Sequence, residues 1–313
     1  MNMNKIKKLL DKFYLTNGDF IDCKIELIKS GHNRTVYLLT TKNDKKYVAK
    51  KGNESKDLGS SNLNDVRVQS FLKEMGCNFV PEIIYWDNEN DFHIESFVGK
   101  EDIKFNNLNN EGLDVFAKQL AFVHSLSAEQ YQQFSAKHGF DKSIIVSPIE
   151  NLNIYGFDRF EIVKQLCPDN YVKDWLYTHL QNNLAYIQKN SLINGAAHLN
   201  WGDIGENLRR KDSVLYFIDW EFSRLGSGTE LSYIKIHSHL SPEKFDYLVS
   251  RYAFYSGRTN KNLLVGINST EKITRVNDVV WAAMKWGQSE TAEDKEKYKE
   301  LTYKRIKLAE KIL

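Results

Sequence analysis

The strongest constraint on the fold is a change of sequence pattern near Gly99. Before it, short segments rich in β-branched and aromatic residues are separated by polar turns, which predicts strands. After it, apolar residues recur at helical spacing over long stretches. We therefore predict an α+β chain with two lobes. Residues 1–98 form a small β-rich lobe, and residues 99–313 form a large helical lobe.

Periodicity and turn signals locate the expected elements. Strands are expected at residues 21–28, 35–40, 46–50, 83–86 and 92–98, and helices at residues 1–13, 66–75, 113–125, 171–189 and 292–313. Two further apolar segments, residues 196–201 and 214–219, lie between long helices. We expect these two to pair with each other as a hairpin whose ends reach a cleft.

Composition and charge exclude several classes of protein. The 313 residues are 42% hydrophobic and 27% charged, which is ordinary for a globular chain. The net charge of +2 gives no sign of the basic field that nucleic-acid binding needs. We therefore expect no nucleic-acid partner. The sequence does not predict the oligomeric state.

Cysteine usage and hydropathy indicate the compartment. The three cysteines, Cys23, Cys77 and Cys167, are widely separated and form no CxxC pair, which fits a reducing cytoplasm. No run of about 18 apolar residues is present, so we expect no membrane-spanning helix. The lysine-rich start lacks the continuous apolar region of a signal peptide.

The central segment carries the residues best suited to chemistry. Asp203 is followed by Asn207, and Asp219 ends a later apolar strand. Phosphoryl transfer requires a group that accepts a hydroxyl proton, in-line positioning and charge neutralisation. One carboxylate can serve as the base, while an amide oxygen and a second carboxylate can hold Mg²⁺. Taken singly, these residues would be turn formers or a strand-end cap, but their order favours a kinase site.

This segment resembles the catalytic loop and metal-binding strand of the aminoglycoside phosphotransferase and choline kinase superfamily, which has a protein-kinase-like bilobal fold. The family pattern is His-Gly-Asp, an Asn five positions after the Asp, and a strand ending Ile-Asp-Trp/Phe-Glu. The resemblance implies that Asp203 is the catalytic base and that Asn207 and Asp219 bind Mg²⁺.

The sequence departs from the family pattern at two positions. Trp201 stands where the family usually has His, and Asn207 follows Asp203 by four residues. Gly205 would ease the tighter turn, and Glu206 is the alternative metal ligand. Elsewhere the helix that contains His124 is similar to the family's Leu-Ala-x-Leu-His-x-Leu helix, and we interpret His124 as structural. Glu230 takes the place of the family's Asp that braces the catalytic loop.

The β-rich lobe is expected to bind the nucleotide. Residues 47–50, Tyr-Val-Ala-Lys, resemble the family's strand that ends in the phosphate-binding lysine. Strand alternation favours Lys50, which shares a face with Val48, and leaves Lys51 as the alternative. Asp65 matches the family's acidic partner by spacing, although a helix N-cap is nearly as good an interpretation.

Two backbone segments complete the expected nucleotide site. The turn with Ser30, Gly31 and Asn33 would cover the phosphates with backbone N–H groups. The strand that ends in Ser96, Phe97 and Val98 looks like the family's hinge, whose backbone binds the adenine.

The acceptor is the least constrained part of the prediction. Trp281 and Trp286 lie on a segment loosely similar to the Trp-x-x-x-Trp helix of choline-type kinases, where an aromatic cage could hold an ammonium group. The alternative, which we favour, is that both are core residues. The resemblance implies an enzyme that uses ATP or GTP with Mg²⁺ to phosphorylate a small-molecule hydroxyl on an aminoglycoside-like compound, a choline-like amine or a sugar. Two alternatives are a catalytically weak or inactive nucleotide-binding module and a kinase of macromolecules.

Overall fold

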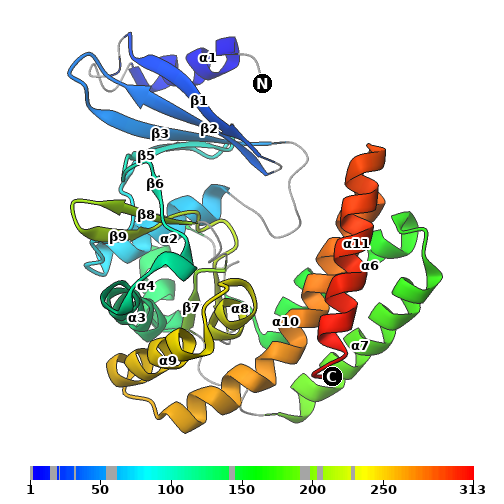
Figure 1. Ribbon diagram of the computed structural model, residues 1–313. Coiled ribbons are helices and arrows are strands. Elements are labelled where there is room, and N and C mark those ends of the chain that lie inside the picture. Colours follow the sequence, from blue (N-terminus) through cyan, green and yellow to red (C-terminus); the bar gives the residue numbers. More distant parts are fainter. Residues whose placement is uncertain are drawn as a thin grey trace. The chain divides into compact units, whose positions relative to one another are not determined.

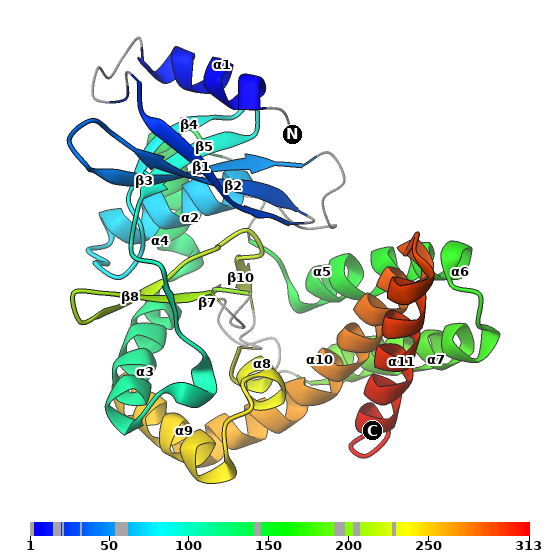
Figure 2. The ribbon, with the colours of Figure 1, turned by 45° about the horizontal axis from the view of Figure 1, so that its top comes forward.

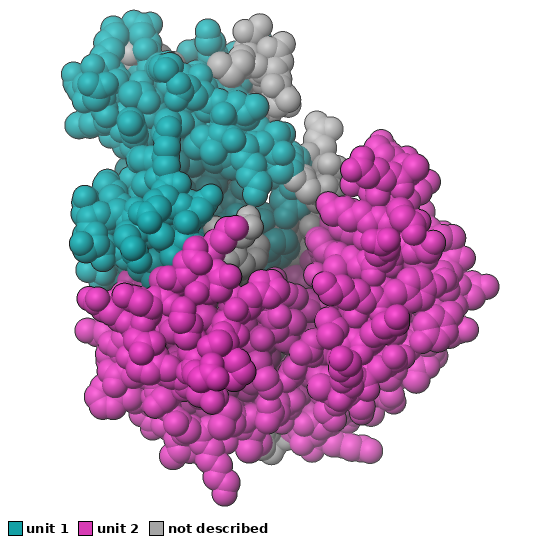
Figure 3. All heavy atoms as spheres, in the orientation of Figure 1, with its two compact units in different colours: residues 1–103, 206–223 teal, residues 104–205, 224–313 magenta. Residues whose placement is uncertain are grey.

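The protein is an α+β chain, as predicted, and its residues pack into two units. The computed structural model describes residues 3–14, 20, 22–31, 33–53, 62–140, 145–190, 198–202, 207–226 and 230–313. Unit 1 comprises residues 1–103 and 206–223, and unit 2 comprises residues 104–205 and 224–313 (Figure 3). By packing, the segment 206–223 therefore belongs with the first hundred residues. The expected lobe boundary at residue 98 stays a prediction.

Unit 1 is built on an antiparallel sheet of five strands in the order β1-β2-β3-β5-β4. Its elements are α1 (Met3–Tyr14), β1 (Lys24–Ser30), β2 (Arg34–Thr40), β3 (Lys46–Gly52), α2 (Asn62–Glu74), β4 (Ile83–Asp87), β5 (Phe92–Ser96), β6 (Glu101–Asp102), β8 (Leu208–Lys211) and β9 (Val214–Phe217). Strands β6, β8 and β9 form a second, three-stranded sheet.

The helix α1 covers one face of the five-stranded sheet, and α2 packs against β3, β4 and β5 (Figures 1 and 2). Apolar side chains of α1 recur at helical spacing and meet every second residue of the strands. This first core contains Ile6, Leu9, Leu10, Phe13, Phe20, Tyr37, Leu39, Ala49, Phe92 and Ile94. The predicted amphipathic N-terminal helix thus packs as a cover for the sheet.

Unit 2 is mainly helical. Its elements are a short 3₁₀ helix (Phe105–Asn107), α3 (Asn110–Ser125), α4 (Ala128–His138), α5 (Pro148–Leu152), a π-helical turn (Asn153–Phe157), α6 (Asp158–Leu166), α7 (Asn170–Lys189), β7 (His198–Asn200), β10 (Arg224–Gly226), α8 (Glu230–His237), α9 (Pro242–Ser256), α10 (Asn260–Gln288) and α11 (Ala292–Ala309). Among the helices that the structure describes, none combines the length and apolarity that crossing a membrane requires.

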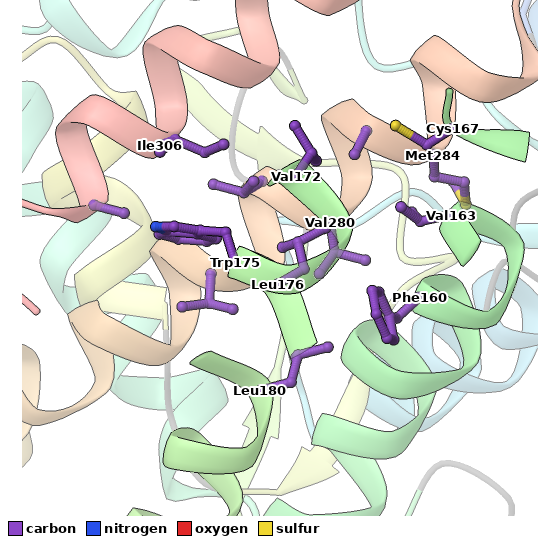
Figure 4. Close-up of a cluster of buried hydrophobic side chains, with 14 of the residues drawn as sticks. Phe160, Val163, Cys167, Val172, Trp175, Leu176, Leu180, Val280, Met284 and Ile306 are labelled. Atoms are coloured by element: carbon purple, nitrogen blue, oxygen red, sulfur yellow. The ribbon is translucent and has the colours of Figure 1, made fainter. Parts of the chain in front are cut away.

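The helices α6, α7, α10 and α11 enclose the core of unit 2 (Figure 4). Val163, Val172, Leu176 and Val280 are fully buried there. Val280 follows the other three by more than a hundred positions in sequence, so tertiary packing rather than local propensity holds this group together.

The predicted hairpin between residues 196–201 and 214–219 is wrong. Segment 214–219 pairs instead with β8, and β7 pairs with β10 in a separate two-stranded sheet. The strand β8 reads Leu-Arg-Arg-Lys, so its charged, exposed residues give no hydrophobic signal. The actual turn is Asp212-Ser213, with φ of 49° and 66°, which is the left-handed geometry of a tight two-residue hairpin.

Candidate active site

Lys50 lies in the buried face of the five-stranded sheet. Its Nζ is 3.2 Å from Asp65 Oδ2 and 3.0 Å from Glu95 Oε1, and the residue is only 4% exposed. The neighbouring Lys51 lies on the opposite face of β3, where its Nζ donates to the carbonyl of Gly52 at 3.0 Å. Strand alternation thus separates the two lysines as expected, and the one brought to a carboxylate pair is Lys50.

Asp65 is the centre of this charged group. It lies inside α2, which begins at Asn62, so it is not the helix N-cap. Its Oδ1 accepts from Gln69 Nε2 at 3.3 Å and from the backbone N–H of Trp220, while Oδ2 faces Lys50 and Arg34. The fully buried carboxylate therefore has a polar partner at each of its two oxygens.

Glu95 is a member of the site that the sequence analysis missed. It lies on β5 opposite Val48 of β3, which brings its side chain onto the same face as Lys50. Besides Lys50, it accepts from Gln69 Nε2 at 3.0 Å and lies 3.4 Å from His93 Nε2. The pairing of β3 with β5 is the only signal that could have found it, and this pairing is non-local.

The environment keeps these groups ionised. Burial acts against the charge of Lys50, but Asp65 and Glu95 outweigh it and raise the pKa of the ammonium. Burial likewise acts against the charge of Asp65 and Glu95, yet the attraction of Lys50 holds the pKa of both carboxyls below their usual range. Asp65, His93 and Glu95 have donor atoms within 4.8 Å of one another, as in a metal site. The Lys50 ammonium already supplies the cation at that position.

Asp219 has an unusual backbone conformation. It follows β9 with φ of 66°, a left-handed conformation that a residue with a side chain seldom adopts. The residues after it are anchored: the Trp220 N–H donates to Asp65, and the Glu221 carbonyl accepts from Asn64 Nδ2 at 3.0 Å. The left-handed backbone and these two anchors fix the chain at Asp219 and directly after it.

Asn207 lies beside Asp219 at the end of the same hairpin. Its backbone carbonyl accepts from the Ile218 N–H at 3.0 Å. Carboxylate and amide oxygens are the hard ligands that Mg²⁺ prefers. Burial raises the pKa of Asp219 to about 7, against the opposing attraction of Arg34 and Lys50. A divalent cation would stabilise its ionised form, so these two residues fit a magnesium site.

The predicted base, Asp203, and the alternative ligand, Glu206, lie outside the described residues. The entry to their loop is described. The backbone N–H groups of Trp201 and Gly202 both donate to Glu230 Oε1, the latter at 3.0 Å. The other oxygen of Glu230 pairs with His124 Nε2, and His124 Nδ1 lies 2.8 Å from the Tyr252 hydroxyl. Glu230 thus joins Trp201 and Gly202 to the helices α3 and α9 of unit 2.

The turn between β1 and β2 is closed by one hydrogen bond within it and one from Asn53, which follows β3. The Gly31 N–H donates to the Arg34 carbonyl at 2.9 Å, and Asn53 Nδ2 donates to the Gly31 carbonyl at 2.8 Å. Ser30 is the last residue of β1, paired with Thr35 of β2. Since the Gly31 N–H is already used inside the turn, it is not available to a phosphate in this conformation.

The expected hinge is partly engaged in the sheet. The Ser96 N–H donates to the Glu82 carbonyl at 2.8 Å, and the Phe97 carbonyl accepts from Lys211 Nζ at 3.3 Å. Beyond it, Gly99 has φ of 105°, and a Cβ there would lie 2.6 Å from the Arg210 carbonyl oxygen. Only glycine fits this position, where the chain leaves the sheet.

Of the two tryptophans considered for an aromatic cage, Trp286 is a core residue and Trp281 is partly buried against the same core. Trp286 is 8% exposed and packs near Tyr303, with ring centres 6.2 Å apart. Trp281 packs against the same core, with Tyr298 at its edge and the Arg305 guanidinium 5.0 Å above its ring. A cation of the protein itself therefore lies over one face of the Trp281 ring.

Comparison with known proteins identifies the fold. No family model matches the sequence, and no curated protein sequence is similar to it. Solved structures are similar over nearly the whole chain. Choline kinase LicA from Streptococcus pneumoniae superimposes with a TM-score of 0.68 at 15% identity, over 98% of each chain. The chain has a protein-kinase-like fold. The resemblance predicted from the sequence is thereby confirmed at the level of the fold.

Two further structures widen the comparison. An ethanolamine kinase of Plasmodium vivax gives a TM-score of 0.66 at 14% identity, over 96% of this chain and 85% of that one. The protein APH(2'')-IIa, solved in a ternary complex with streptomycin and ATP, gives 0.61 at 15% identity, over 93% and 95%. These neighbours are small-molecule kinases and phosphotransferases. Such low identities establish the fold alone.

Proposed function

We propose that this protein is a small-molecule kinase that moves the γ-phosphoryl group of ATP or GTP to a hydroxyl group. The observation that carries the proposal is the buried Lys50–Asp65 pair, which is joined by a hydrogen bond to the backbone next to Asp219. A lysine fixed by a carboxylate, close to an aspartate that follows a strand, matches the requirements of phosphoryl transfer. The fold of the structural neighbours is consistent with it.

In this proposal, separate residues bind the phosphates, the adenine and the metal ion. Lys50 would pair with the α- and β-phosphates, and the turn with Ser30, Gly31 and Asn33 would lie over them. Because the Ser96 amide is already used, the proposed adenine contacts narrow to Phe97 and Val98. Asp219 and Asn207 would hold Mg²⁺, which when bound neutralises charge on the phosphates. Asp203 would accept the proton of the acceptor hydroxyl.

The acceptor class remains a choice among small hydroxyl compounds. The structural neighbours include a choline kinase, an ethanolamine kinase and a protein bound to streptomycin. Trp286 lies in the core, and Trp281 packs against it with Arg305 over its ring, which argues against an aromatic cage for a quaternary ammonium. A screen must therefore include aminoglycosides, choline-like amines, sugars and nucleosides.

The test is transfer of labelled phosphate from ATP and from GTP across this panel. With a positive acceptor, Asp203→Asn should lower kcat by about 10²–10⁴-fold, the usual contribution of a general base. Nucleotide affinity should stay near the wild-type value, because the base does not contact the nucleotide. Asp219→Ala should instead weaken magnesium-dependent nucleotide binding. Wild-type turnover by Asp203→Asn would show that the assigned base is wrong.

A nucleotide-binding module without catalysis is the second candidate. It is favoured by the ion pair in which Arg34 Nη1 lies 3.1 Å from Asp219 Oδ1, where a metal ligand should be accessible. Such a protein would gain thermal stability with Mg·ATP but would give no product that depends on Asp203. Product formation with any acceptor excludes this candidate.

A further inference from the structure

Arg34 joins three carboxylates from three different segments of unit 1. Its Nη1 pairs with Asp65 of α2 and lies 3.1 Å from Asp219 Oδ1, and its Nη2 lies 2.6 Å from Glu221 Oε2. The side chain is only 6% exposed. The guanidinium is planar and permanently charged, so it can hold several carboxylates in a fixed arrangement.

The contact with Arg34 distinguishes the two oxygens of Asp219. Oδ1 faces the guanidinium and is buried from solvent. The side chain as a whole is 26% exposed, so its accessible part lies away from Oδ1. A metal ion approaching Asp219 from solvent can therefore reach its other oxygen, while Oδ1 already has a cationic partner.

We propose that Arg34 acts as a built-in cation at the metal end of the site, holding one oxygen of Asp219 so that the nucleotide complex binds a single divalent ion. The inference rests on the proposed function, in which Asp219 is a metal ligand. Arg34 is then a positioning residue that sets the metal stoichiometry. Arg34 is the first residue of β2, directly after the turn with Ser30, Gly31 and Asn33. It therefore also ties this end of β2 to Asp219.

The experiment counts Mn²⁺ ions bound per protein in saturating AMP-PNP, by electron paramagnetic resonance of the free ion. Wild type should bind one ion. Arg34→Met should bind two, because Oδ1 of Asp219 becomes available. Arg34→Lys keeps a cation at the position and should still bind one. Wild type binding two ions, or Arg34→Met remaining at one, would overturn the proposal.

A charge-balanced variant keeps the test valid if Arg34→Met fails to fold. The double variant Arg34→Met/Glu221→Gln removes one positive and one negative charge together, so the net charge of the cluster is unchanged. Its fold is verified by circular dichroism, and it should also bind a second ion; a count of one would argue against the proposal as strongly as in the single variant.

Asp219→Asn separates this proposal from the proposed function. If Asp219→Asn loses Mn²⁺ binding while removal of Arg34 leaves the count at one, only the role of Arg34 is wrong. If Asp219→Asn binds Mn²⁺ as wild type does, or wild type binds none beyond the free nucleotide, Asp219 is not the ligand and both proposals fail.

Discussion

The two faces of the five-stranded sheet bury different kinds of side chain. Toward α1 the strands present Tyr37, Leu39, Ala49, Phe92 and Ile94, all apolar or aromatic. On the other face, the same strands present the charged members of the site. They are Arg34, Lys50, His93 and Glu95. Each strand serves both faces because its side chains alternate.

The contrast shows how one sheet combines stability with function. Apolar side chains favour folding in proportion to the area that they bury, at about 25 cal/mol per Å². Charged side chains lose hydration on burial, so their face is stable only when every member has its partners. The apolar face should therefore tolerate conservative changes, and the charged face should not.

The largest effect is expected from Lys50→Met on the charged face. The change leaves Asp65 and Glu95 buried with one cation fewer, which should lower the free energy of unfolding by about 3–5 kcal/mol. It should also abolish stabilisation by Mg·ATP, because the phosphates lose their cation. Urea unfolding and thermal shifts with nucleotide measure the two effects.

Lys51→Met is the matched control. It makes the same chemical change one residue later, on the opposite face of β3, where Lys51 is only partly buried and its Nζ donates to a carbonyl. We expect a change within about 0.5 kcal/mol, the usual range for surface substitutions. Equal losses in the two variants would contradict the distinction between the faces.

On the apolar face, Leu39→Ala should cost about 3 kcal/mol, within the range for leucine truncation in a packed core. Leu39 is fully buried on the face of the sheet that α1 covers, so the change leaves a cavity. The folded variant should bind nucleotide with wild-type affinity, as measured by calorimetry below its melting temperature. A large loss of affinity would mean that the two faces are coupled.

The smallest expected effect is on the pH dependence of the free energy of unfolding, which Glu95→Gln should weaken. The attraction of Lys50 holds the pKa of Glu95 below its usual range. A carboxyl with a lowered pKa in the folded state stabilises the fold above its unfolded pKa, and this contribution is lost as the pH falls below about 4–5. Wild type should therefore lose stability more steeply between pH 5 and pH 3 than Glu95→Gln does, by about 1 kcal/mol.

Chemical denaturation at both pH values gives this difference. Glu111 is an exposed glutamate on α3, so Glu111→Gln is the control for the general loss of carboxylate charge. This variant should lose as much stability between pH 5 and pH 3 as wild type does. If Glu95→Gln and wild type lose stability equally, Glu95 does not contribute through its ion pair.

Local patterns predicted much of this architecture. Alternation and turn residues located β2, β3 and β4 within two residues of their bounds, and apolar spacing located α1, α3 and α7. The same alternation placed Lys50 rather than Lys51 toward the acidic residues. These predictions succeeded because each depends on residues close together in the chain.

Three features escaped prediction for a common reason. The strand β8 has no apolar pattern and forms only because β9 and β6 pair with it. Glu95 reaches Lys50 through the β3–β5 pairing, and Arg34 reaches Asp219 across 185 positions of sequence. No local signal specifies such contacts.

The sequence by itself determined the division into a β-rich part and a helical part, the place of the elements with a strong local pattern, and the residues proposed for phosphoryl transfer. Only the tertiary structure decided which charges meet. Side-chain periodicity is a local property of the backbone, whereas the desolvation and pairing of Asp65, Glu95, Asp219 and Glu221 with two cations depend on which strands and helices pack together.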